Sequence, residues 1–245
     1  MGSGNARGFG NLSGRTMNPI IVIPARLEST RLKNKLLLDE TGHPLIWHTV
    51  LSAQNTGYRT VVATDSRKIG RACYPICASL YTGEASSGTE RISKVVEHEI
   101  FQNHDVVINW QGDEPDIPPE SISGLLEALE SHDVATIASP ADHHEIYDIN
   151  TVKVVINHSK QALYFSRQQI PGYKHIGIYA YKKPFLENLD KQIPSAYEVS
   201  ENLEQLRWLH NGYSIGVHVT NHYSIGIDTR EDYDRFLTNY FHRMG

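Results

Sequence analysis

The sequence has few cysteines and no long apolar run, and both absences narrow the kind of protein that it encodes. Its 245 residues contain two cysteines, Cys73 and Cys77, which are too few for a disulfide framework. No second cysteine pair completes a zinc site, so we expect both to be packing residues in a reducing cytoplasm. The sequence also has no run of about 18 apolar residues, so it predicts no transmembrane helix.

Positive charge is not in excess either. The formal net charge is −5, whereas proteins that bind duplex nucleic acid normally carry a basic excess, so we do not expect a nucleic-acid partner. Residues 1–16 are rich in glycine and lack the apolar segment of a signal peptide, and we expect them to form a flexible leader, such as a tag. The remaining residues, 17–245, are enough for a single large α/β domain.

The two common glycine-rich phosphate motifs, G-x-x-x-x-G-K-[ST] and G-x-G-x-x-G, are missing, so any phosphate site must use side chains. The strongest charge cluster follows residues 20–23, an apolar run that predicts a buried central strand ended by Pro24. Cations beyond the carboxyl end of a first strand lie where an open α/β sheet binds its ligand, although a solvated basic loop is the alternative. Arginine and lysine together favour a triphosphate. The polar residues of this loop are Arg26, Ser29, Thr30, Arg31, Lys33 and Lys35.

Apolar runs alternate with helical periodicity along most of the chain. This alternation predicts a mostly parallel, Rossmann-like sheet with helices on both faces. Residues 140–190 differ, because strands at 152–156, 162–165 and 175–181 follow one another without a helix, which predicts an antiparallel insert within the domain. Towards the C-terminus, the pattern predicts one helix over 198–211 and another from Arg230 to about Phe241.

Other polar segments also fall at strand or helix ends. Residues 86–89 begin a predicted helix, where free N–H groups bind an anion or a base edge, or simply form a cap. Residues 111–115, Q-G-D-E-P, follow a strand and offer carboxylates to Mg²⁺, or merely form a turn. Thr229 or Asp228 could cap the last helix, and Asp228 by itself is best interpreted as its cap. The adjacent histidines at 143 and 144 lack a third ligand, so we do not expect a metal there.

Eight motifs occur in chain order: P-A-R-x-x-S-T-R-L at 24–32, A-T-D at 63–65, S-G-T-E-R at 87–91, Q-G-D-E-P at 111–115, Y-F-S-R at 164–167, H-x-G-I-Y at 175–179, L-E-Q-L-R at 203–207 and G-x-D-T at 226–229. Together they resemble the motifs of the 3-deoxy-manno-octulosonate (Kdo) cytidylyltransferase family, also called CMP-Kdo synthetases. The resemblance covers nearly all of residues 20–240. It implies an α/β fold of the nucleotide-diphospho-sugar transferase type and a homodimer. It also implies Mg²⁺-dependent transfer of a cytidylyl group from CTP to a 3-deoxy-octulosonic acid, for lipopolysaccharide or capsule biosynthesis.

The resemblance also implies a role for individual residues. Catalysis would use Arg26, Lys35 and Asp113. The nucleotide would contact Ala25, Arg26, Ser29, Arg31, Lys35, Ala63, Thr64, Asp65, Ser87, Gly88, Thr89 and Gln111. The sugar acid would contact Arg167, His175, Tyr179, Glu201, Glu204 and Gln205. Asp113 and Asp228 would bind Mg²⁺, which replaces the local interpretation of Asp228 as a cap.

Two departures from the family pattern leave the exact sugar open. Lys33, Asn34 and Lys35 stand where the family has P-G-K, and only three residues, 172–174, connect Pro171 to His175 where the family has a longer connection. An 8-amino form of Kdo is therefore an alternative to Kdo itself. Further alternatives are transfer to a nonulosonic acid, nucleotidyl transfer to a sugar 1-phosphate, and a catalytically silent nucleotide-binding module.

Overall fold

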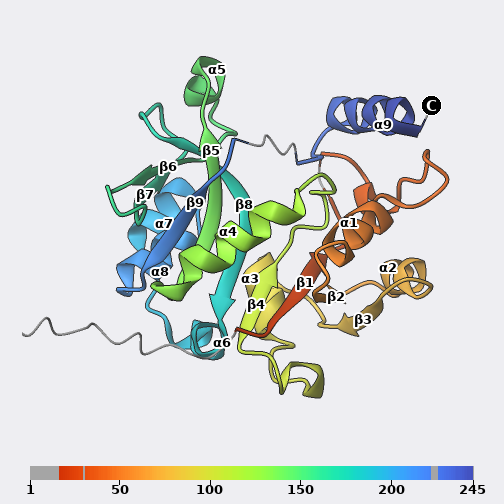
Figure 1. The fold of residues 1–245 in the computed structure, drawn as a ribbon, viewed down its shortest axis with the longest axis horizontal. Helices are drawn as coiled ribbons and strands as arrows, with labels where there is room; N and C mark the ends of the chain where they lie inside the picture. The colour runs from red at the N-terminus through yellow and green to blue at the C-terminus, as the bar shows by residue number, and fades with distance from the viewer. Residues whose placement is uncertain (1–16, 30, 222–225, 245) are drawn as a thin grey trace, which may run out of the picture.

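A single mixed sheet organises the part of the chain that the computed structural model describes, residues 17–29, 31–221 and 226–244. Within these residues, nine strands form one sheet whose main path is β3-β2-β1-β4-β8-β5-β9, with β6 and β7 attached through β8 (Figure 1). The predicted leader lies outside the described residues, and so do Thr30 of the basic loop and residues 222–225.

The parallel half of the sheet contains β1 (Pro19–Ala25), β2 (Arg59–Thr64), β3 (Ala78–Tyr81) and β4 (Val106–Asn109). Contrary to the prediction, β1 does not end at Pro24. The carbonyl of Val22 accepts the N–H of Trp110, which follows β4, so the backbone groups of Val22 face β4. Residues two apart in a strand direct their backbone groups to the same side, so those of Pro24 also face β4. Because pairing with β4 ends at Val22, the N–H that proline lacks is not needed there.

The other half of the sheet contains the predicted antiparallel insert, which is confirmed. The long strand β8 (Tyr173–Lys182) runs antiparallel to both β4 and β5 (Val134–Pro140). Two shorter strands, β6 (Lys153–Ile156) and β7 (Ala162–Ser166), form an antiparallel pair, and β6 joins the start of β8. The last strand, β9 (Ile215–Val219), is parallel to β5.

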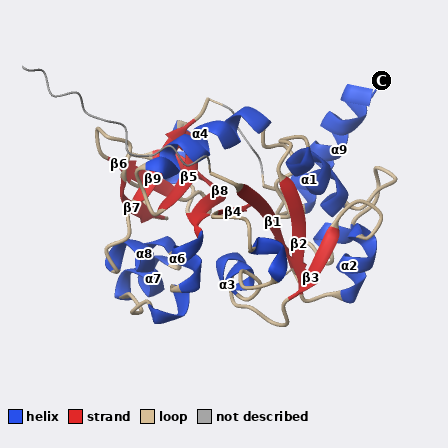
Figure 2. Ribbon diagram, turned by 60° about the horizontal axis from the view of Figure 1, so that its bottom comes forward, coloured by secondary structure: helices blue, strands red, loops and turns tan. Residues whose placement is uncertain are grey.

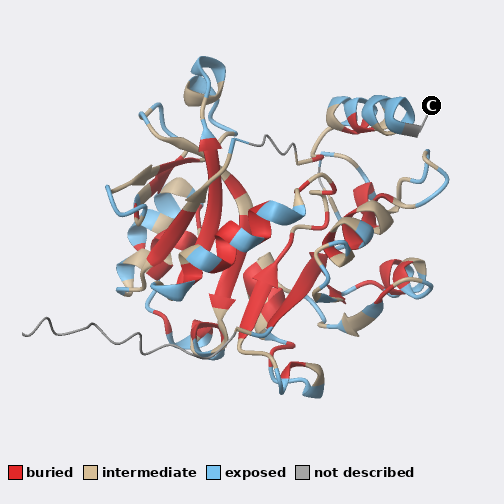
Figure 3. Cartoon of the chain, viewed as in Figure 1, coloured by how far each residue is buried: buried red, intermediate tan, exposed pale blue. Residues whose placement is uncertain are grey.

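Helices cover both faces of the sheet, as predicted (Figure 2). The core on one face includes α1 (Leu45–Gln54), α2 (Arg67–Cys73), α4 (Pro119–Glu130) and α9 (Arg230–Met244). The core on the other face includes α3 (Gly88–Ser93), α6 (Lys183–Glu187) and α8 (Gln205–His210). Figure 3 shows the central strands as buried and the outer sides of the helices as exposed. Burial on both faces explains why the central parallel strands β1 and β4 contain continuous runs of Val and Ile.

Two helix predictions need correction. Residues 198–211 do not form one helix, because α7 (Ala196–Glu201) ends at Asn202, whose φ of 53° is left-handed, before α8 begins. Glu201 and Gln205 therefore do not share one helix face. The structure also contains a short helix that we did not predict, α5 (His143–Tyr147), which Asp142 and Glu145 stabilise as a capping box.

Among the residues that the structure describes, the remaining short elements are three 3₁₀ segments, η1 (Lys35–Leu37), η2 (Glu99–Phe101) and η3 (Leu189–Lys191). Across the described residues, no helix combines the length and the apolar character that crossing a membrane requires.

Candidate active site

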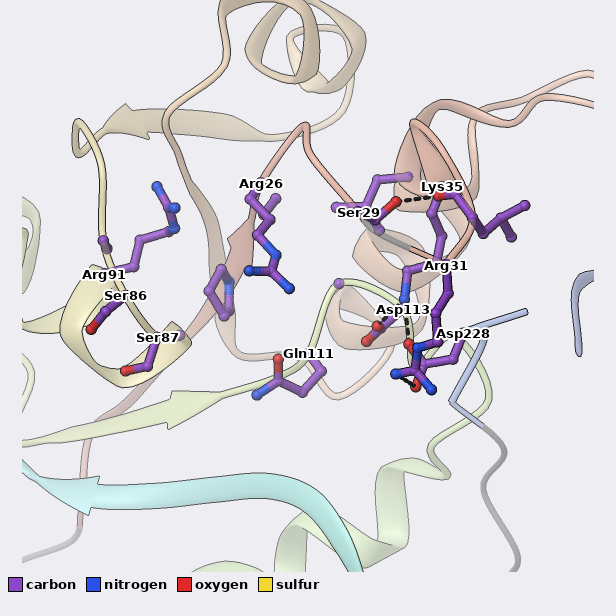
Figure 4. A pocket seen from close by; sticks show the side chains of 17 residues that line it. Arg26, Ser29, Arg31, Lys35, Ser86, Ser87, Arg91, Gln111, Asp113 and Asp228 are labelled. Carbon is purple, nitrogen blue, oxygen red and sulfur yellow. Dashed lines mark hydrogen bonds and ion pairs between the residues drawn. The ribbon is translucent and has the colours of Figure 1, made fainter. Parts of the chain in front are cut away.

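A cavity of about 250 Å³ opens at the carboxyl ends of β1 and β4, where the parallel half of the sheet was expected to bind a ligand. Figure 4 shows its two ends, with Lys35, Arg31 and the two aspartates at one end and Ser86, Ser87 and Arg91 at the other. The polar residues that line it are Arg26, Ser29, Arg31, Lys35, Ser86, Ser87, Arg91, Gln111, Asp113 and Asp228.

At the first end, one lysine ammonium lies between two carboxylates. The Nζ atom of Lys35 is 2.6 Å from Oδ2 of Asp113 and 2.8 Å from Oδ1 of Asp228. The Lys35 side chain is only 9% exposed. Burial disfavours its charged form, but the two carboxylates outweigh burial, so the pKa of Lys35 is raised above its ordinary value. Lys35 therefore carries a positive charge at neutral pH.

Asn34 explains how Lys35 reaches this place without the family's P-G-K turn. Asn34 precedes η1 and has a φ of 54°, in the left-handed region. Asparagine adopts this conformation more readily than most residues with a side chain, so it can replace glycine in a sharp reversal. The reversal brings the Lys35 side chain into contact with both aspartates.

Asp113 and Asp228 converge, although more than a hundred residues separate them in the sequence. The second oxygen of Asp228 also accepts a hydrogen bond from Arg31, with a nitrogen-to-oxygen distance of 2.7 Å. Asp228 does not cap α9, because the Thr229 hydroxyl accepts the N–H of Asp232 instead. Two carboxylates that face one cation fit Mg²⁺, which usually takes one or two protein carboxylates and completes its shell with water and phosphate oxygens.

The number of ligands that the protein itself offers is small. In the described ranges there is no group of three or more His, Cys, Asp or Glu side chains that could hold a metal ion. A cation between Asp113 and Asp228 would therefore depend on further ligands from water or from a bound phosphate. The predicted metal role of the two aspartates stays a prediction.

The other end of the cavity is built on the start of α3. Ser87 caps this helix by accepting the N–H of Glu90, and Gly88 lies so close to Pro24 that an added Cβ would be 3.2 Å from its ring. The amide of Gln111 lines the same end. Small side chains and hydrogen-bonding groups at this place suit a flat base and a ribose.

Not every predicted nucleotide residue reaches the cavity. Ala63 and Thr64 are buried in β2 and do not line it. Asp65 accepts a hydrogen bond from Arg91 at 2.8 Å, and Arg91 lines the cavity in its place. Thr89 points into the protein, where its hydroxyl bonds to Tyr181 and Glu204.

The predicted sugar residues lie in three groups, and the first two are in contact, because the ring centroids of His175 and Tyr179 are 5.3 Å apart. His175 lines a second cavity of about 310 Å³ that it shares with Arg31 and Asp228 of the first. Its Nε2 atom is 2.9 Å from the Thr136 hydroxyl, and burial lowers the pKa of His175 to about 3, so the ring is neutral at physiological pH. This second cavity places His175 beside the cluster of Lys35 and the aspartates.

Glu204, Gln205 and Tyr179 form the second group. Gln205 and Tyr179 are buried, and Glu204 is half-buried against Thr89 of α3. Glu204 accepts a hydrogen bond from Thr89, and burial raises its pKa. The third group contains Arg167 and Glu201, which bond to each other through the Arg167 backbone N–H at 2.9 Å. Neither residue of this third group lines the first or the second cavity.

Comparison with known proteins identifies the family. A family model described as cytidylyltransferase matches residues 20–215. The chain belongs to the cytidylyltransferase family. The 3-deoxy-manno-octulosonate cytidylyltransferase of Polynucleobacter necessarius is 40% identical, with 92% of this chain and 96% of the relative aligned. The enzyme of the same name from Anaeromyxobacter sp. is also 40% identical, over 88% of this chain and 93% of its own length.

A solved structure supports the same assignment. The structure of CMP:2-keto-3-deoxy-manno-octonic acid synthetase complexed with CTP matches with a TM-score of 0.86 at 34% identity, over 92% of this chain and 99% of that one. The family resemblance and the fold class predicted from the sequence are therefore confirmed.

One polar residue of this cytidylyltransferase cavity, Arg91, was not predicted, whereas Ser86 belongs to the predicted segment 86–89. Arg91 is the last residue of the S-G-T-E-R motif, so the sequence did indicate that it is important. Because it was expected within a helix, however, the sequence did not indicate that Asp65 is its partner. Its side chain is 4% exposed and also donates to the Thr82 hydroxyl and the Gly83 carbonyl. Arg91 therefore fastens the loop after β3 and the end of β2 to α3.

Proposed function

We propose that this chain transfers a cytidylyl group from CTP to a 3-deoxy-octulosonic acid in a Mg²⁺-dependent reaction. The anomeric hydroxyl oxygen of the acid would bond to the α-phosphorus, and the bond from that phosphorus to the β-phosphate bridging oxygen would break to release pyrophosphate. The observation that carries the proposal is the convergence of Asp113 and Asp228 on one cation beside an arginine-lined cavity. Relatives of that name, 40% identical over most of the chain, support the sugar class.

The cavity suggests how CTP would bind. The triphosphate would lie along Arg26, Arg31 and Lys35, and the cytosine and ribose would lie towards Ser87 and Gln111. Such an arrangement needs little covalent chemistry from the protein, because phosphoryl and nucleotidyl transfer depend mainly on positioning and charge neutralisation. When bound between Asp113 and Asp228, Mg²⁺ would neutralise phosphate charge and lower the pKa of the attacking hydroxyl.

Lys35 would have two roles in this account. Without ligands, its ammonium neutralises Asp113 and Asp228. With a metal in that place, the ammonium would turn to the phosphate oxygens of CTP, which would occupy the cavity that Lys35 lines. Lysine suits this change because a flexible stem carries its compact charge.

The sugar acid would bind next to the phosphates, on the side of His175 and the second cavity. Arg167 would pair with its carboxylate, since the guanidinium fork matches a carboxylate with two hydrogen bonds. The neutral ring of His175 would offer a hydrogen bond to a sugar hydroxyl without adding charge. We also expect the enzyme to act as a homodimer and its product to serve lipopolysaccharide or capsule assembly, and both expectations come from the family alone. The expected cytoplasmic location comes from the cysteine content.

The test is product analysis with CTP, Mg²⁺ and a panel of acceptors: Kdo, 8-amino-Kdo, a nonulosonic acid and a sugar 1-phosphate. We expect one CMP-octulosonate and one pyrophosphate for each CTP consumed, with Kdo or its 8-amino form as the best acceptor. A preference for the nonulosonic acid or the sugar 1-phosphate would overturn the proposed substrate. Calorimetric binding of CTP without pyrophosphate release for any acceptor would instead indicate a catalytically silent module.

A further inference from the structure

Lys153, the first residue of β6, has no accessible surface at all. A buried lysine is costly unless each of its three protons has an acceptor. Here all three do, because Nζ donates to the main-chain carbonyls of Asp148, Thr151 and Arg167 at 3.0, 2.8 and 3.0 Å. Throughout the described part of the chain, no carboxylate lies within ion-pair distance of this ammonium. The charge of Lys153 therefore serves to hold backbone.

Glu201, at the end of α7, binds the backbone of Arg167 as well, on the N–H side of that residue. Its Oε2 atom accepts the backbone N–H of Arg167 at 2.9 Å, and its Oε1 atom accepts the Ser166 hydroxyl at 2.8 Å. The backbone N–H of Arg167 is thus bound by a carboxylate and its carbonyl by an ammonium. Figure 1 shows β6, β7 and α7, which carry these groups, at the same end of the sheet.

This arrangement changes the interpretation of Glu201. The sequence predicted that Glu201 contacts the sugar acid, but both of its oxygens already accept hydrogen bonds from protein groups at the end of β7. A carboxylate would also repel an acidic substrate placed near it. Holding Arg167 is the role that these contacts favour.

Lys153 also connects Arg167 to the second cavity. Asp148 and Thr151, whose carbonyls it binds, line that cavity together with Asn150 and His175. The Arg167 guanidinium is 3.4 Å from the Asn150 carbonyl, so its side chain leans on the same loop. One ammonium therefore fixes the backbone of the arginine and the loop that supports its guanidinium.

We propose that Lys153 and Glu201 are a positioning pair that orients Arg167 for the carboxylate of the acceptor acid. The proposal rests on the proposed function in one respect, the role of Arg167 in binding that acid. Neither Lys153 nor Glu201 touches the substrate in this account. Both act through Arg167, so their removal should affect binding of the acid and leave binding of CTP unchanged.

The first test measures KM for the acid and for CTP separately in Lys153→Met, Glu201→Ala and Arg167→Ala variants. We expect each variant to raise KM for Kdo by about tenfold, with KM for CTP within about twofold of the wild type. Glu201→Gln keeps an acceptor oxygen, so it should recover part of the loss. Lys183→Met is the control, because Lys183 is a half-buried lysine whose ammonium contacts the Phe101 carbonyl and the Glu187 carboxylate and not Arg167.

The decisive arm is the double variant Arg167→Ala with Glu201→Ala. If Glu201 acts through Arg167, the second substitution adds no further increase in KM, because the guanidinium is already gone. Additive effects would show that Glu201 contacts the acid directly and would overturn the proposal. A parallel rise of KM for CTP in the single variants would also overturn it, since that result indicates general loosening of the fold.

A second readout does not depend on activity. Amide hydrogen exchange should become faster at Arg167 in Glu201→Gln, and at Arg167 and residues 148–151 in Lys153→Met if that variant folds, with α1 and α4 unchanged. Exchange at Arg167 should be faster still in Glu201→Ala, which removes the acceptor, and unchanged exchange at Arg167 in Glu201→Ala would refute the pair. If the wild-type protein transfers nothing to any acid, the proposed function fails, and this exchange measurement still decides whether the two side chains hold Arg167.

Discussion

Replacing Lys35 with methionine tests whether its ammonium occupies the place of a metal ion. Methionine keeps most of the stem and removes the charge that now lies 2.6 Å from Asp113 and 2.8 Å from Asp228. In the absence of nucleotide, a metal must displace this ammonium before it can bind. The variant removes the competitor, so we expect divalent metal to bind more tightly without CTP.

The size of the effect follows from the exposure of the two ion pairs. The Asp113 and Asp228 side chains are 27% and 43% exposed, so each pair with Lys35 is partly screened by water. Pairs of this kind contribute about 0.5–1 kcal/mol each. Together they amount to about 1–2 kcal/mol, which corresponds to roughly a 5- to 30-fold gain in metal affinity, since about 1.4 kcal/mol is tenfold.

The assay is titration with Mn²⁺ as a paramagnetic substitute for Mg²⁺, followed by electron paramagnetic resonance at pH 7.5 without CTP. Lys33→Met is the control, because Lys33 is an exposed lysine in the same loop. With CTP and the acid present, the substitution should be harmful instead. Lys35→Met should lose about 100-fold or more in turnover, because a preorganised donor to phosphate is missing. An unchanged or weaker Mn²⁺ affinity in the variant without CTP would refute the reasoning.

Three further predictions concern single residues. Asp113→Asn should lower pyrophosphate release by at least about 100-fold while circular dichroism and the thermal midpoint stay close to wild type, and undiminished release would rule Asp113 out as a metal ligand. Arg91→Met should lower the free energy of unfolding by about 1–2 kcal/mol in urea titrations, because Arg91 is only 4% exposed and its loss leaves the Thr82 hydroxyl, the Gly83 carbonyl and the partly exposed Asp65 carboxylate without their donor; a loss below about 0.5 kcal/mol would contradict this. His175 has a pKa of about 3 in the folded state and about 6.5 when unfolded, so its contribution is constant above pH 6.5 and stability falls as the pH drops towards 3. His175→Gln should make this acid decline shallower in urea midpoints measured from pH 4 to 8, and an unchanged slope would contradict the buried neutral ring.

Much of the fold was predictable because each element carries its own signal. The runs at 20–23 and 106–109 are continuous and β-branched, which is what strands buried on both faces require. The helix starts near Pro119 and Ser87 have their expected capping signals. Cys73 and Cys77 are both free and buried, as predicted.

Other features depend on long-range contacts that local patterns do not carry. Nothing in the sequence around 173–182 indicates that β8 inserts antiparallel between β4 and β5. The break at Asn202 was missed because the apolar spacing continues across it and asparagine, unlike proline, does not exclude a helix. The helix α5 was missed because it buries none of its residues, so its only signal was the capping box.

The candidate site also contains some residues that local patterns predict and others that they do not. The cations after β1 and the carboxylate of Asp113 were predictable from their place at strand ends, whereas Asp228 by itself looked like a cap and only the family pattern brought it to the metal. The structure supports the family pattern, because Asp228 meets Lys35 and Arg31 and leaves the cap to Thr229. Lys153 gave no signal, since a lysine at the start of a strand is usually exposed and its three partners are main-chain carbonyls.

The most direct test of the whole account is a crystal of the wild-type protein grown with CTP and Mn²⁺ and examined by anomalous diffraction. We predict one anomalous peak within coordination distance of both Asp113 and Asp228, with the triphosphate along Arg26 and Arg31 and the Lys35 ammonium turned to a phosphate oxygen. A manganese ion bound elsewhere, with Lys35 still between the two aspartates, would contradict the account.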